Sequence, residues 1–306
     1  MTRFDSVLLI AFGGPTAPPE IRPFLEVVTR GRRIPPERLE DVARHYERMP
    51  GRRSPLCELT RAQARALERE LAARGPALPV FVGMRNWQPF LHETLAEMTG
   101  KGVKHALGII LSPFRTEASW ERYQQDVTEA RAGVLGAPDV AYAPAWFGHP
   151  RFVDAVADRT RAALTEVPPA GRAKTPLVFT AHSVPVAMAD ASPYVSDFTS
   201  AARAVATPLG RERWSLAYQS RSGNPREPWL EPDIAAVLKR LGSDGERHVV
   251  VVPIGFACDH VELLYDLDIE ARAVATAHGV TMHRAAAVND HPAFIAMLAD
   301  LVRSAA

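Results

Sequence analysis

Three carboxylates recur at helical spacing near the carboxyl end of the chain. Glu262, Asp266 and Glu270 occupy positions i, i+4 and i+8, so a helix would carry all three on one face. Like charges at this spacing repel each other by about 0.2–0.5 kcal/mol per pair. The row therefore favours a bound cation, and a divalent metal is the obvious candidate. The alternative is a solvated acidic face, which is common on exposed helices.

A histidine on another segment could complement these carboxylates. His182 follows the apolar run 177–180, so we expect its imidazole at the carboxyl end of a strand. It could take up a proton near neutral pH or ligate a metal, and one histidine with several carboxylates suits a transient or hydrated divalent ion. The alternative is a structural histidine hydrogen-bonded to a loop carbonyl. Ser183 lacks a G-x-S-x-G elbow, which argues against a serine hydrolase.

The segment that carries Glu262 is predicted to be a strand followed by a capped helix. The β-branched run 249–252 stops at Pro253, and the pattern after Asp259 changes from strand-like to helical. Asp259 would be the N-cap and Glu262 its acidic partner in a capping box. A capping-box glutamate needs no further function, so this role alone could explain Glu262.

Apolar runs alternate with helical patterns along the chain and predict βαβ units with parallel strands. Strands are expected at 7–12, 80–83, 107–111, 177–180, 215–219, 249–252 and 280–283. Helices are expected at 20–29, 36–48, 60–74, 89–98, 120–133, 151–166 and 292–302. The segments VLLIAFGGP and PLVFTAHSVP look like the first strands of two similar halves, 1–146 and 147–306. The predicted fold class is therefore α/β, with two doubly wound halves and a ligand cleft between them.

Composition excludes several classes of protein. The net charge of +1 gives no overall field for nucleic acid, and GGPTAPPE matches no phosphate-binding fingerprint. The amino-terminal apolar run is too short to span a membrane and lacks a signal-peptide cleavage site, so we expect a cytoplasmic protein without stable membrane insertion. Cys57 and Cys258 are too few for a four-cysteine zinc or iron–sulfur site.

Arginines gather in the amino-terminal third of the chain, close to aromatic residues. This combination suits a flat aromatic anion, because arginine pairs with carboxylates and stacks on rings. Solvated surface is the alternative for most of these arginines. The arginines are Arg30, Arg32, Arg33, Arg52 and Arg53, and the aromatic residues are Phe24 and Tyr46.

Taken together, the motifs resemble the ferrochelatase family nearly from end to end. They are LLIAFGGP, VTRGRRIP, GRRSPL, VFTAHSVP, AYQSRSGNPREPWLEPD and PIGFACDHVELLYDLDIE. The resemblance implies two Rossmann-like halves and insertion of ferrous iron into a porphyrin in haem biosynthesis, with release of two protons. It implies that Fe2+ is a substrate, that no cofactor is tightly bound, and that no iron–sulfur cluster is present.

The resemblance also implies roles for individual residues. His182 would be the inner-site histidine, which accepts a pyrrole proton or helps carry the metal, and Glu262 would be its partner. Glu262, Asp266 and Glu270 would pass protons or cations along their helix face. These four residues are the predicted metal-handling set, and His182 and Glu262 are the predicted catalytic pair.

On the porphyrin side, the resemblance implies contacts from Arg30, Tyr46, Ser54 and Tyr123. Phe12 occupies a substrate-binding position where some relatives have a tyrosine whose oxygen can reach the metal. Phenylalanine has no such oxygen, so that contact is absent here. Similarly, Phe114 stands where some relatives place a histidine, which puts a metal role for that loop in doubt.

The charged, arginine-rich region 22–53 favours a porphyrin with more carboxylates, so we expect coproporphyrin III as the substrate. Protoporphyrin IX stays open as a substrate. Two other functions also stay open, a cobalt chelatase of corrin synthesis and a non-catalytic haem carrier. We expect a monomer that passes its product to a transient partner.

Overall fold

The computed structural model describes residues 3–31, 35–222 and 226–305. Arg32 and Arg33 lie outside these residues. The chain divides into two compact units. Unit 1 comprises Met1–Ser112, Ala118–Pro144 and Asp290–Ala306, and unit 2 comprises Pro113–Glu117 and Ala145–Asn289.

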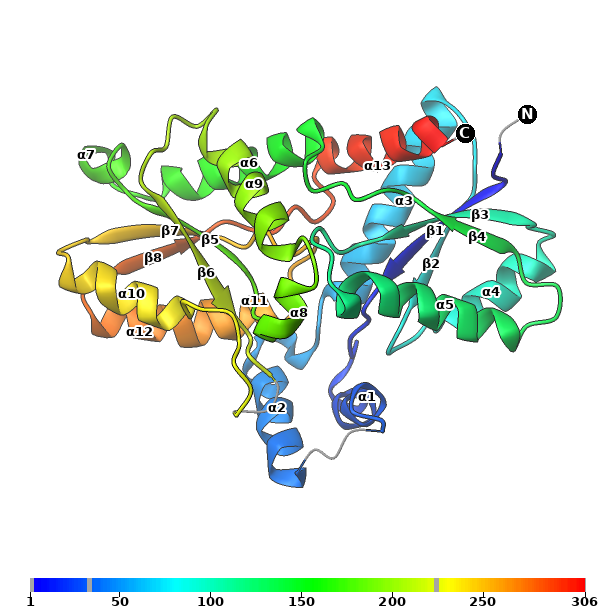
Figure 1. Cartoon of the computed structure of the whole chain (residues 1–306), viewed down its shortest axis with the longest axis horizontal. Coiled ribbons are helices and arrows are strands. Elements are labelled where there is room, and N and C mark those ends of the chain that lie inside the picture. The colour runs from blue at the N-terminus through cyan, green and yellow to red at the C-terminus, as the bar shows by residue number, and fades with distance from the viewer. Residues whose placement is uncertain (1–2, 32–34, 223–225, 306) are drawn as a thin grey trace. The chain divides into compact units, whose positions relative to one another are not determined.

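Unit 1 contains a four-stranded parallel sheet with the order β2-β1-β3-β4 (Figure 1). Three of its strands were expected, and the fourth was not, because DVAY is short and only half-buried. Its strands are β1 (Ser6–Ala11), β2 (Val80–Met84), β3 (His105–Ile110) and β4 (Asp139–Tyr142). Its α-helices are α1 (Ile21–Val28), α2 (Pro36–Arg48), α3 (Leu56–Arg74), α4 (Leu91–Gly100), α5 (Arg122–Ala132) and α13 (Pro292–Ala305), and shorter helical turns span Pro18–Glu20, Pro50–Arg52 and Glu117–Glu121.

Unit 2 repeats the same arrangement with a second parallel sheet, in the order β6-β5-β7-β8 (Figure 1). In each sheet the first strand along the chain lies between the second and the third, so the prediction of an α/β fold with two similar halves is confirmed. Its strands are β5 (Leu177–His182), β6 (Trp214–Gln219), β7 (His248–Val252) and β8 (Thr281–Arg284). Its α-helices are α6 (Pro150–Thr165), α7 (Pro169–Arg172), α8 (Val186–Asp190), α9 (Tyr194–Ala206), α10 (Ile234–Ser243), α11 (Val261–Leu264) and α12 (Arg272–Ala277), with a π-helical turn at Asp266–Ala271.

The carboxyl-terminal helix belongs to unit 1, whereas the sequence-based division placed it in the second half, 147–306. Helix α13 buries Phe294, Leu298 and Leu301 and lies against α3, so Asp290–Ala306 belong to unit 1. None of the described helices is both long and apolar enough to cross a bilayer.

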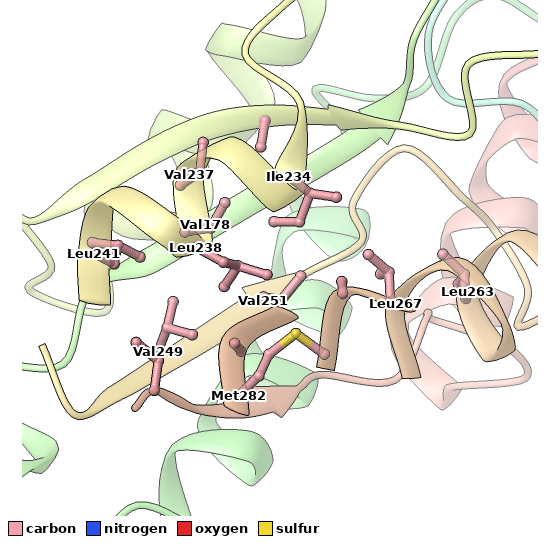
Figure 2. Close-up of a cluster of buried hydrophobic side chains, with 14 of the residues drawn as sticks. Val178, Ile234, Val237, Leu238, Leu241, Val249, Val251, Leu263, Leu267 and Met282 are labelled. Atoms are coloured by element: carbon pink, nitrogen blue, oxygen red, sulfur yellow. The ribbon is translucent and has the colours of Figure 1, made fainter. Parts of the chain in front are cut away.

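The core of unit 2 fixes the segment that carries the acidic residues. Leu263 and Leu267 are fully buried in a cluster with Val178 and Val251 from the sheet and Leu238 from α10 (Figure 2). Each of these leucines removes apolar surface from water, which stabilises the fold by about 1.5–3 kcal/mol per side chain. Their neighbours in sequence, which include the predicted carboxylates, are therefore held at a defined place beside the sheet.

The single regular helix predicted from Asp259 is wrong. Helix α11 begins at Val261, and a π-helical turn at Asp266–Ala271 separates it from α12. In this turn the backbone N–H groups of Ile269 and Glu270 both donate to the Tyr265 carbonyl, each at 3.0 Å. A π turn accommodates an extra residue, so carboxylates four positions apart no longer repeat at α-helical steps.

Candidate active site

His182 ends strand β5, next to the loop that follows the neighbouring strand β7. Gly255 in that loop donates its N–H to the Thr180 carbonyl at 3.0 Å. A Cβ atom at position 255 would lie 2.7 Å from the Cα of Ala181, so the loop can approach β5 this closely only with glycine. The strand order changes direction at this pair of strands, which is where parallel sheets of this type commonly bind ligands.

Two contacts fix the position and the tautomer of His182. The Nδ1 atom lies at hydrogen-bonding distance from the Ser183 carbonyl, and the Tyr194 hydroxyl donates to the His182 carbonyl at 2.7 Å. Because a carbonyl only accepts, Nδ1 must carry the hydrogen, and in the neutral ring the lone pair is on Nε2. The imidazole can therefore accept a proton or contact a metal through Nε2, as its predicted role requires.

Glu262 lies between two histidines. Its Oε1 atom is 3.7 Å from His182 Nε2, and its Oε2 atom is 3.4 Å from His260 Nε2. His260 Nδ1 faces the Cys258 carbonyl at 3.1 Å, so this nitrogen carries a hydrogen as well. The structure thus brings the predicted pair His182 and Glu262 together and adds a second imidazole on the opposite oxygen.

The two histidines keep the Glu262 carboxylate charged. Burial opposes its charged form, but the charge of His182 and the hydrogen bond and charge of His260 outweigh it and lower the Glu262 pKa to about 2. For His260, burial favours the neutral ring, yet the hydrogen bond and charge of Glu262 prevail and raise the pKa of this histidine. The lowered pKa therefore favours the charged form of the Glu262 carboxylate beside the Nε2 atom of His182.

The predicted capping box at Asp259 and Glu262 is wrong. The N-cap of α11 is His260, without a side-chain cap, and Glu262 faces the histidines instead of a backbone N–H. Asp259 accepts hydrogen bonds from Arg284 Nη1 at 2.7 Å and from Asn289 Nδ2 at 2.8 Å. The carboxylate of Asp259 is committed to a buried ion pair, which competes with capping because it satisfies the same oxygens.

Asp266 accepts a hydrogen bond from the Ser220 hydroxyl and is repelled electrostatically by the carboxylates of Glu262 and Glu270. Burial, the largest effect, and these two negative charges outweigh the hydrogen bond from Ser220 and raise the Asp266 pKa to about 7. Ser220 holds this position with a positive φ of 62°, a backbone conformation that serine rarely adopts. Glu270 is exposed. A uniformly solvated acidic face therefore does not describe the row.

No three His, Cys, Asp or Glu side chains of the described residues converge closely enough to hold a metal ion. A cation that passes from one carboxylate to the next, as predicted for His182, Glu262, Asp266 and Glu270, needs no closed site. The metal-handling roles of these residues stay a prediction.

In unit 1, aromatic contacts link three of the five predicted porphyrin-binding residues. Phe24 contacts the ring of Phe12, with centroids 6.4 Å apart, and the ring of Tyr46, with centroids 6.1 Å apart. The Arg85 guanidinium lies 5.9 Å from the centroid of Phe12 and 4.3 Å from that of Tyr123. Phe12 is 39% exposed, whereas Tyr46 and Tyr123 are buried. Phe12 therefore presents the accessible ring of this cluster.

The other two predicted porphyrin-binding residues lie in the loop before α3 and in the turn after α1. Ser54 is buried, its N–H donates to the Pro15 carbonyl at 2.8 Å, and its hydroxyl accepts from Leu56 N at 3.3 Å. Arg30 is exposed in the turn after α1. Phe114, which stands where some relatives have a histidine, is buried against Tyr194 in unit 2 and has no ligating atom.

Comparison with known proteins identifies the family. A model of the ferrochelatase family matches residues 5–306. The chain belongs to the ferrochelatase family. It is 41% identical to the coproporphyrin III ferrochelatase of Mycolicibacterium smegmatis, over 98% of the chain and 89% of that protein. It is 43% identical to the coproporphyrin III ferrochelatase of Mycobacterium avium (98% and 87% covered) and 40% identical to a ferrochelatase of Rhodopirellula baltica (98% and 86% covered).

Solved structures support the fold assignment. SirB from Bacillus subtilis with Fe3+ is 12% identical, has a TM-score of 0.60, and is covered over 95% of its length by 98% of this chain. The sirohydrochlorin chelatase SirB from Bacillus subtilis subspecies spizizenii, in complex with cobalt, has a TM-score of 0.56 at 12% identity (98% of this chain and 94% of that one). The ferrochelatase chain therefore has the fold of other chelatases.

Two residues that contact predicted site residues, His260 in unit 2 and Arg85 in unit 1, were not assigned roles from the sequence. His260 stands two positions before Glu262, a separation that hides their contact because neighbours at i and i+2 do not face each other on a helix. The extended conformation of His260, with φ −159° and ψ −170°, turns its ring back toward the carboxylate. No sequence signal marks Arg85, which contacts the rings of residues far away in the chain.

Proposed function

We propose that this ferrochelatase inserts Fe2+ into coproporphyrin III, as a lyase of haem biosynthesis. The observation that carries the proposal is the pairing of His182 Nε2 with the Glu262 carboxylate at 3.7 Å, in a chain with 41–43% identity to coproporphyrin III ferrochelatases. Fe2+ is the second substrate, not a resident cofactor, and the reaction releases the two pyrrole protons.

In the proposed reaction, His182 is the base that accepts a pyrrole proton. Its Nε2 lone pair is available because Nδ1–H donates to the Ser183 carbonyl. The imidazolium that forms would face the negative Glu262, and two opposite charges about 4 Å apart near a protein surface attract each other by about 4 kcal/mol. Glu262 thus lowers the free energy of the charged state that proton abstraction creates.

Asp266 and Glu270 are proposed to carry protons or Fe2+ toward or away from this pair. A carboxyl group with a pKa of about 7 exists in both protonation states at neutral pH, so Asp266 can take up and release protons there. Glu270 is exposed and provides the contact with solvent. The proposed relay therefore runs from His182 and Glu262 through the half-buried Asp266 to the exposed Glu270.

The proposed preference for coproporphyrin III is supported by the names of the relatives and by the charge of the amino-terminal segment. Arg22, Arg30, Arg52 and Arg53 are exposed, and a tetracarboxylate can pair with more of them than a dicarboxylate can. Arg22 and Arg53 also pair with Glu40 and Glu58, at 2.6 and 3.2 Å, but exposed ion pairs contribute little and exchange readily.

Initial rates of metal insertion by the purified protein under anaerobic conditions test the proposal. We expect Fe2+ insertion with coproporphyrin III, and a kcat/KM at least tenfold lower with protoporphyrin IX. The reverse preference would assign the chain to protoporphyrin IX. Insertion of Co2+ with no insertion of Fe2+ would indicate a cobalt chelatase, and tight haem binding without turnover would indicate a carrier.

A further inference from the structure

Gln219 contacts both sides of the proposed catalytic pair, although it belongs to neither. It is the last residue of β6 and is paired in register with His182 on β5. Its carbonyl accepts the N–H of Ser183 at 2.7 Å, and its side-chain Nε2 donates to the backbone carbonyl of Glu262 at 2.6 Å. A single residue therefore connects the backbone of the histidine strand with that of the glutamate helix.

The orientation of the Gln219 amide follows from these contacts. The Glu262 carbonyl can only accept, so the nitrogen of the amide must face it, and the Oε1 atom must point the other way. Oε1 is buried and has no hydrogen-bond partner among the described residues, and the residue as a whole is 1% exposed. A buried acceptor without a partner costs stability, so the side chain contributes to the fold through its Nε2 donor and not through Oε1.

We infer that Gln219 is a positioning residue that sets the separation of His182 Nε2 and Glu262. The inference rests on the proposed function, since it assigns Gln219 a role in that reaction. The Glu262 side chain extends from a backbone that is held at β6 through the glutamine amide, while His182 is held at β6 through the β5–β6 ladder. Loss of the amide removes a hydrogen bond that helps to hold α11 beside β6, in addition to the burial of Leu263. A displacement of about 1 Å in an active site can reduce the rate about 100-fold.

The first test is Q219L, which keeps the approximate volume of the side chain but removes both amide atoms. We expect kcat for iron insertion to fall about ten- to a hundredfold, with KM for the porphyrin changed less than about twofold. The melting temperature should fall by a few degrees, because the Glu262 carbonyl loses its donor while the unpaired Oε1 is removed as well. A kcat within twofold of wild type would overturn the inference.

The matched control is Q63L, which removes another buried glutamine side chain, on α3 in unit 1. It should leave the kcat within about twofold of wild type. An equal loss of kcat in Q63L and Q219L would mean that any buried glutamine is needed, which would overturn the specific role of Gln219.

Two further variants keep the test decisive if Q219L folds poorly. Q219E preserves the shape, but its carboxylate cannot donate to the Glu262 carbonyl until it is protonated, so its activity relative to wild type should rise as the pH falls. A pH-independent ratio would contradict the inference. In a double-mutant cycle, Q219L should reduce kcat little further in the E262Q background, because Gln219 acts through Glu262. Multiplicative losses would also contradict it.

The outcomes separate this inference from the proposed function. A wild-type protein that inserts iron into neither porphyrin would refute the proposed function. Wild-type activity that survives in Q219L would refute only the positioning role of Gln219.

Discussion

Removal of Arg284 should destabilise the segment that presents Glu262. Arg284 is only 11% exposed at its side chain, and its guanidinium binds two carboxylates. Nη1 donates to Asp259 at 2.7 Å, while Nη2 and Nε donate to the two oxygens of Asp268 at 2.8 and 2.9 Å. In the variant Arg284→Met the two carboxylates lose their shared cation in a place where water reaches them poorly.

The expected loss follows from the burial of these partners. Removal of one member of a buried ion pair costs about 3–5 kcal/mol. Asp259 and Asp268 are 15% and 25% exposed, so partial hydration favours the lower end, about 3 kcal/mol. For a domain of this size, 1 kcal/mol corresponds to about 2–4 °C in melting temperature, which gives a decrease of about 6–12 °C.

Thermal and urea unfolding of wild type and Arg284→Met would measure this loss. The control is Arg272→Met, because Arg272 pairs with the same Asp268 at 3.1 Å but is 46% exposed. Exposed pairs contribute about 0–1 kcal/mol, so the control should lose much less stability. Equal small losses in the two variants would refute the argument that burial of the Arg284 pairs stabilises this segment.

Three further predictions concern the site itself. His182→Ala should reduce kcat for iron insertion at least 100-fold; near-normal turnover would remove His182 from the mechanism. As the pH rises, the wild-type protein should lose stability that the variant Asp266→Asn keeps. The raised pKa of Asp266 stabilises the folded wild type fully below pH 3.8, the pKa in the unfolded chain, and this stabilisation disappears by about pH 7. In urea unfolding, the difference in unfolding free energy between the variant and wild type should change by about 4 kcal/mol between acidic pH and pH 8. A difference that does not change with pH would contradict the burial of this carboxyl. Tyr194→Phe should cost about 1–3 kcal/mol in the same assay and lower kcat, because the buried His182 carbonyl loses its donor; unchanged values would show that this bond does not matter.

The parallel sheets were predictable from the sequence because continuous apolar, β-branched runs are typical of parallel strands that are buried on both faces. The run 249–252 coincides with β7 to within one residue at its start. Helices α9 and α10 were missed, although both bury apolar residues on one face. In α9 the many alanines and hydroxyl residues weaken the periodic apolar pattern on which helix prediction depends.

The pairing of His182 with Glu262 followed from motif resemblance, but its surroundings did not. The commitment of Asp259 to Arg284 depends on a residue in strand β8, which the local sequence around Asp259 does not reveal. The π-helical turn at Asp266–Ala271 was also not predicted. The local sequence predicted a capping box at Asp259, but in the structure the Asp259 carboxylate pairs with Arg284 instead. Likewise, the raised pKa of Asp266 arises chiefly from burial, which cannot be read from the spacing of acidic residues.

The repeated strand order gives the two sheets corresponding ends. Phe12 follows Ala11 at the end of β1, just as His182 follows Ala181 at the end of β5, and Pro15 and Pro185 stand three residues later. At this position unit 2 carries His182, the proposed base, and unit 1 carries the ring of Phe12, which has no atom that could accept a proton or ligate a metal. Under the proposed function, a substitution at Phe12 changes a porphyrin contact without changing the residue that accepts the proton.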